Sequence, residues 1–538
     1  MAISSKGVII SAMVGPSEEV NLDRAMKSAK GQAVGLERRG RGHGQFLALM
    51  TSAILVIGLV MLLQLTPASA AEGYLDRSVA DAGAAIGHPL SGPRETMWPT
   101  ELSTYTVWLP IIARGFTQPY GLFGAQIYAA DPISVDRMSE MRTAWVRLPL
   151  SWAWIEPQNT TPENYNWSAS FEEGLASLSA HHIQVILLVG NNPSWAATYL
   201  NGPIDLADIS ELTQFMQAAV ARYSQPPYNV KYWEMYNEPD NGNVLYAEEG
   251  QGFFGHTPEA YVDILEAVYQ PIKAVDPEAR VLLGGLAYDA WEPDGPFVQD
   301  FLDQVLMDGG DAYFDLMNFH YYLAFRSTWE PYGNDILGKL AFLRGKLADY
   351  SVDKPFVCTE TGWFSNFQSG DGHEIQSQYV VQAFVRSMTT EMEVVIWYTL
   401  VDSAADPRNW GLLDVDLNPK PSYYAYQVLT TLLSRADFVR KLNLEETTPI
   451  LVESYEFATP AGRTIIVAWV NEDTTIQLVR QAPQVIVVDK FGSETVVYDG
   501  DDGEVDGRVH VWVGPSPVYL YFTEIPVRGD DMVQKQKN

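Results

Sequence analysis

Two glutamates stand at the ends of apolar, β-rich runs, where an acid and a base could act together. Glu238 lies in the segment YNEP, directly after Asn237, and Glu360 lies in the segment TETGW. An acetal bond between two sugars is inert near neutral pH. Its cleavage needs a proton on the leaving oxygen and either a nucleophile or an activated water at the anomeric carbon. Two carboxyl groups can supply both, so this pair predicts hydrolysis of a glycosidic bond.

The elements that must position this pair form a regular alternation of strands and helices. Near-continuous apolar runs separated by amphipathic segments, over roughly 310 residues, predict a (β/α)8 barrel. The expected strands begin near Phe123, Ala144, Gln184, Val230, Val281, Phe314, Pro355 and Val394, and helices are expected from Ile209, Thr257, Glu374 and Pro421. An open doubly wound sheet is the alternative, but no glycine-rich phosphate loop follows an early strand.

In such a barrel, reacting groups come from the carboxyl ends of the strands, and strands four and seven lie across the lumen. Glu238 ends the fourth run and Glu360 the seventh, so their side chains are expected to point at one another. At ~5 to 5.5 Å the second carboxylate attacks the sugar and configuration is retained, whereas ~6.5 to 9.5 Å admits a water and configuration inverts.

These motifs together resemble the clan A retaining glycoside hydrolases. The resemblance rests on Asn-Glu-Pro after the fourth run, the glutamate of the seventh and Trp397 on the eighth. The segments WVRLPLSWAWIEPQ and NWGLLDVDLNPKPSYYAY support it. The chain is similar to the xylosidase-like family 39 and the cellulase-like family 5 members. The resemblance implies a hydrolase of O-glycosyl compounds that needs no metal and no organic cofactor.

The resemblance also implies a role for each matching residue. Glu238 would be the general acid and then the base, and Glu360 the nucleophile. Arg147 would hold Glu360 ionised and oriented, and Asn237 would bind the sugar 2-hydroxyl. The remaining three matches are His320 and Tyr322, which would lie near the nucleophile, and Trp397, which would form the floor under the sugar.

Several residues have a simpler structural interpretation. An isolated glutamate at a strand end is usually a salt-bridged structural residue. A catalytic role is favoured here only because Glu238 and Glu360 occur together at the expected strands. Glu234 has the strand parity of Glu238 and is expected to be a bonded carboxylate lower in the barrel. Glu156 is placed in the loop after the second strand. Aromatic filling of the barrel is the alternative for His320 and Tyr322.

Composition excludes several classes of protein. The chain carries 67 acidic against 35 basic residues, a net charge of −32. This balance repels nucleic acid, so no polynucleotide partner is expected. The single cysteine, Cys358, excludes an intramolecular disulfide and a zinc site built on several thiolates.

The sequence divides into six segments. Residues 46–65 carry no charge and suffice to cross a bilayer, and six basic residues between 24 and 41 predict that residues 1–45 stay cytoplasmic. A membrane anchor and a signal cleaved near Ala70 both fit, so the rest is expected outside the cell, touching the membrane only through this segment. A linker (66–118), the barrel (119–434), a β-sandwich (435–528) and a tail (529–538) are expected to follow.

Other interpretations of the site stay open. A cell-surface sugar-binding protein without catalysis would use the same scaffold, and a transglycosylase would use the same residues with a sugar as acceptor. The expected partner is a carbohydrate in each case. The sequence leaves open the sugar, the linkage, exo or endo attack, the role of the β-sandwich and the oligomeric state.

Overall fold

The computed structural model of the protein describes residues 121–160, 164–242, 253–366, 371–442 and 452–522. The expected segments 1–45, 46–65, 66–118 and 529–538 therefore lie outside the described residues. Within the described part of the chain, no helix is long and apolar enough to cross a membrane.

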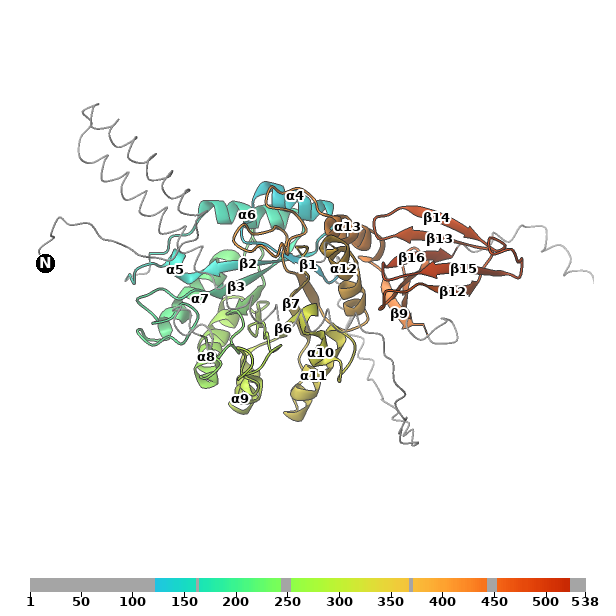
Figure 1. Cartoon of the computed structure of the whole chain (residues 1–538). Coiled ribbons are helices and arrows are strands. Elements are labelled where there is room, and N and C mark those ends of the chain that lie inside the picture. Colours follow the sequence, from blue (N-terminus) through green and yellow to red (C-terminus); the bar gives the residue numbers. More distant parts are fainter. Residues whose placement is uncertain (1–120, 161–163, 243–252, 367–370, 443–451, 523–538) are drawn as a thin grey trace, which may run out of the picture. The chain divides into compact units, whose positions relative to one another are not determined.

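Eight parallel strands form a nearly closed barrel, as the sequence predicts (Figure 1). The strands are β1 (Phe123–Gln126), β2 (Trp145–Ser151), β3 (Gln184–Gly190), β4 (Tyr232–Met235), β5 (Arg280–Leu282), β6 (Met317–Tyr322), β7 (Phe356–Gly362) and β8 (Val394–Trp397). Their order is β5-β4-β3-β2-β1-β8-β7-β6. Parallel bridges Leu282↔Leu316 and Leu286↔Phe319 close the remaining gap between β5 and β6.

Helices surround these strands, with α4, α6 and α13 on one side in Figure 1 and α8, α9 and α11 on the other. The described helices are α4 (Pro132–Glu140), α5 (Trp152–Ile155), α6 (Ala169–Ala180), α7 (Ser210–Tyr223), α8 (Pro258–Val275), α9 (Phe301–Met307), α10 (Arg326–Trp329), α11 (Ile336–Asp349), α12 (Gly372–Met388) and α13 (Pro421–Leu433). Short 3₁₀ turns are η1 (Gly310–Tyr313) and η2 (Leu323–Phe325). The four helices expected from sequence are α7, α8, α12 and α13.

Side chains alternate between the lumen and the helix layer along each strand. A small inner cluster fills the lower lumen and includes Trp145, Ile186, Val357 and Ile396. The residues between them pack outward in the main hydrophobic core. This alternation decides which polar residues further up each strand can face the site.

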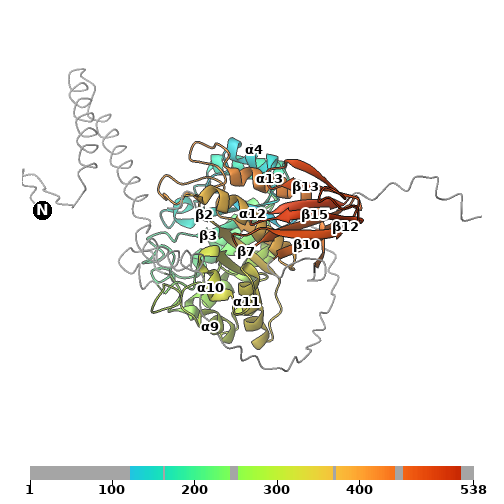
Figure 2. The same cartoon turned by 45° about the vertical axis from the view of Figure 1, so that its right-hand side comes forward.

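A C-terminal β unit follows the barrel, and its strands are antiparallel (Figure 2). They are β9 (Asp437–Lys441), β10 (Val452–Ala458), β11 (Thr464–Val470), β12 (Ile476–Gln481), β13 (Gln484–Asp489), β14 (Glu494–Tyr498), β15 (Arg508–Val513) and β16 (Val518–Phe522). Six form one sheet, and β12 pairs with β15. Tyr455, Phe457 and Trp469 of this unit belong to the same hydrophobic core as the barrel.

Candidate active site

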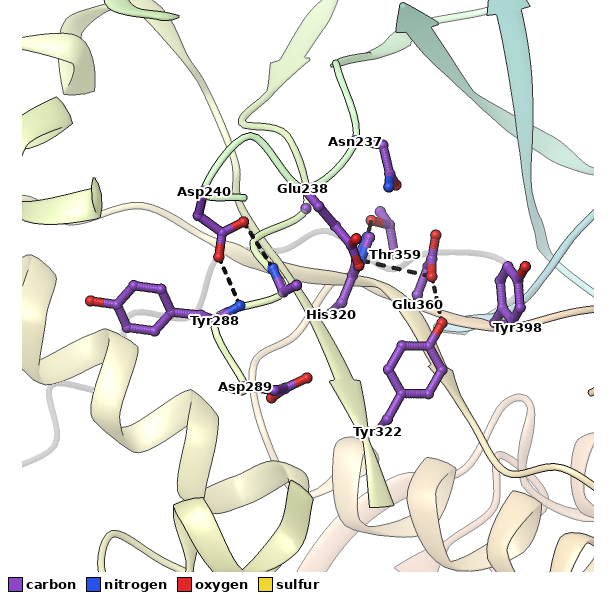
Figure 3. Close-up of polar contacts among 12 residues, drawn as sticks. Asn237, Glu238, Asp240, Tyr288, Asp289, His320, Tyr322, Thr359, Glu360 and Tyr398 are labelled. Atoms are coloured by element: carbon purple, nitrogen blue, oxygen red, sulfur yellow. Dashed lines mark hydrogen bonds and ion pairs between the residues drawn. The ribbon is translucent and has the colours of Figure 1, made fainter. Parts of the chain in front are cut away.

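The two predicted glutamates meet at the carboxyl end of the barrel, although they are 122 positions apart in the sequence (Figure 3). His320 of β6 lies between them. Its Nδ1 is 3.0 Å from Glu238 Oε1 and 3.7 Å from Glu360 Oε2. One carboxylate oxygen of each glutamate and a ring nitrogen of His320 all lie within 4.8 Å of one another. The expected convergence of Glu238 and Glu360 is therefore present.

Arg147 of β2 is completely buried beneath this pair and makes five hydrogen bonds. It donates from Nη1 to Glu360 Oε1 (2.5 Å) and from Nε and Nη2 to Glu234 (2.7 and 2.8 Å). The predicted contact with Glu360 is present, but the two-pronged contact goes to Glu234. Arg147 also donates to Gln126 Oε1 and to Asn237 Oδ1. One guanidinium group thus ties four strands of the barrel mouth together.

A β-bulge in β7 orients Glu360. The pairing of β6 with β7 shifts register between Phe319 and His320, so that Phe319 faces Cys358 while His320 faces Glu360. Thr359 is the additional residue, and its hydroxyl contacts Glu234 and Asn318 inside the barrel. Two successive residues, Thr359 and Glu360, can therefore both reach the lumen side. Tyr322 donates to Glu360 Oε2 at 2.5 Å, so this predicted neighbour is also in place.

Glu238 lies beyond β4 rather than at its end. The strand stops at Met235, since Tyr236 and Glu238 adopt left-handed backbone conformations with φ of 62° and 45°. The Glu238 amide donates to Gly285 O, which fixes the loop against the segment after β5. The side chain is 24% exposed. Burial raises the pKa of Glu238 to about 7, with Arg147 and Lys339 opposing the rise.

His320 contacts Glu238 as a neutral base. Burial lowers its pKa to about 4, and the nearby charge of Glu360 opposes this shift. Its second nitrogen, Nε2, is 3.2 Å from the Thr359 hydroxyl. A neutral imidazole with one ring nitrogen on each side can either accept from a protonated Glu238 or donate to an ionised one.

The predicted role of Trp397 as the floor under the sugar is wrong. Trp397 is fully buried, its ring lies 6.2 Å from that of Tyr379 in α12, and its Nε1 donates to Trp410 O. Because Ile396 faces the lumen, the next residue must face the helix layer. Tyr398 occupies the lumen side instead. Its ring is 6.2 Å from that of Tyr322 and 6.0 Å from that of Trp410, and its hydroxyl is 3.0 Å from that of Tyr128.

Sequence reasoning did not identify three further residues at this end of the barrel. Gln126 and Tyr128 follow from the alternation of β1, because Gly124 shares the lumen-facing parity. Asp240 is buried and accepts from the amides of Ala287 (3.2 Å) and Tyr288 (2.7 Å). Burial raises the pKa of Asp240 to about 7, and the Glu238 charge adds to the rise. No motif marked Asp240, although it stands two positions after Glu238.

Glu234 is a bonded carboxylate, as expected, and Glu156 follows the second strand, as expected, at the end of the short helix α5. Glu234 is buried and accepts from Arg147, Asn318 and the Gly285 amide. Glu156 ends α5 and accepts from the Trp152 indole at 2.8 Å. Neither needs a reacting partner to explain its place.

Within the described residues, Glu238, His320 and Glu360 are the one group with the spacing of a metal site. Their polar atoms already contact one another, and Glu360 also accepts from Arg147 and Tyr322. The Arg147 guanidinium would repel a cation placed beside Glu360. This donor set suits proton transfer better than metal binding.

Comparisons with known proteins agree with this geometry. A family model described as cellulase (glycosyl hydrolase family 5) matches residues 117–400. A β-xylosidase of Caldicellulosiruptor saccharolyticus is 25% identical over 241 residues, which are 42% of this chain and 45% of that protein. The match thus spans less than half the length of this relative.

Solved structures share the fold at low identity. A family 39 glycoside hydrolase from Bacteroides cellulosilyticus WH2 superposes with a TM-score of 0.59 at 20% identity, covering 76% of this chain and 82% of that one. A family 30 endoxylanase from Clostridium papyrosolvens C71 gives 0.52 at 14%, covering 75% and 97%. The family match covers more than half of the chain, and the protein belongs to the cellulase family of glycoside hydrolases, family 5.

Proposed function

We propose that this protein hydrolyses β-glycosidic bonds with retention of configuration, by a double displacement at Glu238 and Glu360. The observation that carries the proposal is the short distance between the two carboxyl groups, whose nearest ligand atoms lie within 4.8 Å. Retaining enzymes need ~5 to 5.5 Å, whereas the inverting route needs at least ~6.5 Å to hold a water.

In the first step, Glu360 attacks the anomeric carbon while Glu238 gives its proton to the leaving oxygen. Arg147 and Tyr322 each donate to one oxygen of Glu360, which aims the carboxylate and stabilises its charge. The pKa of Glu238 near 7, raised by burial, keeps a proton available close to neutral pH. Two carboxyl groups thus take different roles because their surroundings differ.

In the second step, Glu238 takes a proton from water, which then attacks the sugar ester at Glu360. Esterification removes a negative charge near Glu238, so the loss of its own proton becomes easier. His320 can keep its hydrogen bond to Glu238 in both steps. Its Nδ1 accepts from Glu238 when the carboxyl is protonated and donates to Glu238 when the carboxyl is ionised. Bringing a sugar instead of water would give transglycosylation by the same residues.

β-Xylosides are the first substrates to test. The support is the β-xylosidase among the relatives and the endoxylanase among the similar structures. Tyr322 donates to Glu360, and the ring of Tyr398 lies 6.2 Å from that of Tyr322, so these two partly buried rings can offer apolar faces to a sugar.

The test is hydrolysis of a panel of aryl β-glycosides and xylo-oligosaccharides, with the anomer of the first product followed by NMR. We expect the β-anomer first. Glu360→Gln and Glu238→Gln should lower kcat by about 10²- to 10⁴-fold. The matched control, Glu391→Gln at a site 86% exposed, should be unchanged. Binding of glycans by the wild type without any turnover would instead support a carbohydrate-binding protein.

We further propose that turnover needs neither a metal ion nor an organic cofactor, because protons and a carboxylate supply the chemistry. Dialysis against EDTA should leave kcat unchanged, and a loss restored by one divalent ion would contradict this. We also infer that the barrel is exported and that the C-terminal β unit is a β-sandwich that braces it. Fractionation of cells expressing the full chain, with and without residues 46–65, tests export.

A further inference from the structure

A cleft of about 590 Å³ lies at the opposite end of the barrel from Glu238 and Glu360. It is formed by the turns that precede β2 and β3, by the end of α13 and by the turn between β10 and β11. The strands begin at this end, whereas the candidate active site follows their carboxyl ends. The cleft is therefore separate from the site described above.

The lining of this cleft has the opposite charge to the rest of the protein. It includes Arg142, Arg435, Arg463, His181 and His182, and none of its fourteen residues is acidic. The whole chain has 67 acidic and 35 basic residues. In the described part of the chain, no carboxylate forms an ion pair with these three arginines. Three arginines thus line one cleft, and none is ion-paired to a carboxylate of the described residues.

Two of these basic residues occupy backbone positions that favour glycine or asparagine. Arg142 and His182 end α4 and α6 with φ of 54° and 59°, and both amides donate to a carbonyl three residues earlier. Comparable turns before β4 and β7 use Asn229 and Ser351 at φ of 56° and 58°. Arginine is uncommon in this conformation, whereas histidine is among the residues enriched in it. The two turns bring both basic residues to the lining of the same cleft.

We propose that this cleft binds an anionic saccharide through carboxylate, sulfate or phosphate groups on its rings. Guanidinium groups match these oxyanions with paired hydrogen bonds. The hydroxyls of Ser434, Thr431 and Thr459 also line the cleft and suit sugar hydroxyl groups. The choice of a saccharide rests on the proposed function, whereas the choice of an anion rests on the cleft alone.

The net charge of the chain makes the proposal specific. A protein with a net charge of −32 repels polyanions over most of its surface. Binding of an anionic glycan at physiological salt therefore requires a local basic site. Long-range attraction to the protein as a whole would not produce such binding, because the net charge is negative and distant charges are screened.

The test is calorimetric titration of the full chain carrying Glu360→Gln, which blocks turnover. The probes are an oligogalacturonate, a sulfated oligosaccharide, inorganic phosphate and a neutral xylo-oligosaccharide, each at 0.15 M salt. The double variant Arg142→Gln/Arg463→Gln removes two cleft charges. Its charge-matched control is Arg326→Gln/Arg344→Gln, at two arginines 46% and 42% exposed outside the cleft.

We expect at least one anionic oligosaccharide to bind, with Kd raised about tenfold or more by the cleft variant and unchanged in the control. Equal effects of both variants, or no binding of any anionic oligosaccharide, would overturn the proposal. Phosphate binding as tightly as the oligosaccharides would overturn the saccharide assignment. Hydrolysis of a neutral aryl glycoside by the cleft variant without Glu360→Gln reports on the proposed function separately and should not change.

Discussion

Two buried arginines anchor charge clusters in different regions of the molecule. At the barrel mouth, Arg147 donates to Glu234 and Glu360. Where the barrel meets the C-terminal β unit, Arg386 of α12 donates to Asp335 and Glu453. Both guanidinium groups are almost completely buried, and each contacts two carboxylates.

The clusters differ in whether every acid has a direct basic partner. Glu453 accepts from Arg386, Tyr455 and Asn471. Burial would raise its pKa, but Arg386 and these hydrogen bonds outweigh burial and lower it to about 2. At the barrel mouth, Glu238 contacts neutral His320 rather than an arginine, and burial raises its pKa to about 7.

This contrast separates a stabilising cluster from a reactive one. Buried charges that are fully paired hold parts of a fold in register. A third carboxyl group that is partly exposed and lacks a cationic partner costs stability but keeps a usable proton. Buried arginine–carboxylate pairs alone therefore do not identify an active site, whereas the additional acid does.

Replacing each buried arginine should give the largest difference in activity between the two clusters. Arg147→Met should lower kcat/KM roughly a thousandfold or more, because Glu360 loses its oriented donor. Arg386→Met should change kcat/KM by no more than about twofold, since it shares no partner with the site. Both should lose about 3–5 kcal/mol of unfolding free energy, because each leaves buried carboxylates unpaired.

The measurement is kcat/KM on an aryl β-glycoside together with urea unfolding of both variants. Should Arg147→Met fail to fold, Arg147→Lys keeps the charge but loses the paired geometry, and a lowered kcat in the folded protein is still expected. Equal activity loss in the Arg147 and Arg386 variants would remove the distinction between the clusters.

Neutralising one acid in each cluster should shift stability in opposite directions. The folded pKa of Glu453, about 2, lies below the unfolded value of roughly 4.3, so its contribution is present above that value and is lost as pH falls toward 2. Glu453→Gln should therefore cost roughly 3 kcal/mol at pH 7. The folded pKa of Glu238, about 7, lies above the unfolded value, so its ionisation costs stability as pH rises from roughly 4.3 to 7 and the cost is constant above that. Glu238→Gln should therefore be neutral at pH 4 and should stabilise the protein by about 1–3 kcal/mol at pH 8.

Urea unfolding at pH 4, 6 and 8 checks both signs. Glu391→Gln serves again as the exposed control. A destabilised Glu238→Gln variant at pH 8 would show that Glu238 is held for structure and not for its proton.

Strand pattern carried most of what the sequence could reveal. The eight apolar runs correspond to β1–β8, and alternation correctly brought Arg147, His320 and Tyr322 to the lumen. The same rule applied to β8 would have excluded Trp397 and selected Tyr398. Residue type alone favours the tryptophan, whereas strand alternation places Trp397 in the helix layer and Tyr398 on the lumen side.

Other features could not be read from strand pattern. The bulge at Thr359 depends on the pairing between β6 and β7. One additional residue in a strand changes no residue type or pattern that would identify the bulge from the sequence. The left-handed backbone at Tyr236 and Glu238 likewise depends on how the loop after β4 meets Gly285. Asp240 acts through the backbone amides of Ala287 and Tyr288, and the sequence does not indicate such contacts.

Filling the space behind His320 should damage the reactive cluster alone. A Cβ at Gly285 would lie 2.1 Å from His320 Nε2, so Gly285→Ala must displace the imidazole or the loop that holds Glu238. We expect about 1–3 kcal/mol of destabilisation and a lower kcat. Gly345→Ala in α11 is the control, because a Cβ there meets nothing within 4 Å and should stabilise the helix by up to about 1 kcal/mol. An unchanged kcat in Gly285→Ala would mean that His320 does not position Glu238.

The pH dependence of turnover should reveal the unpaired acid most directly. As pH rises through about 7, Glu238 loses its proton, and kcat/KM should fall about tenfold per pH unit for a substrate whose leaving group needs protonation. A dinitrophenyl glycoside departs without help and should lose most of this alkaline limb. Since Arg386 and its partners carry no such acid, Glu453→Gln should leave the midpoint of the limb in place. A limb that is identical for both leaving groups would assign the titration to another residue, with Asp240, whose pKa is also raised to about 7, as the first to test by Asp240→Asn.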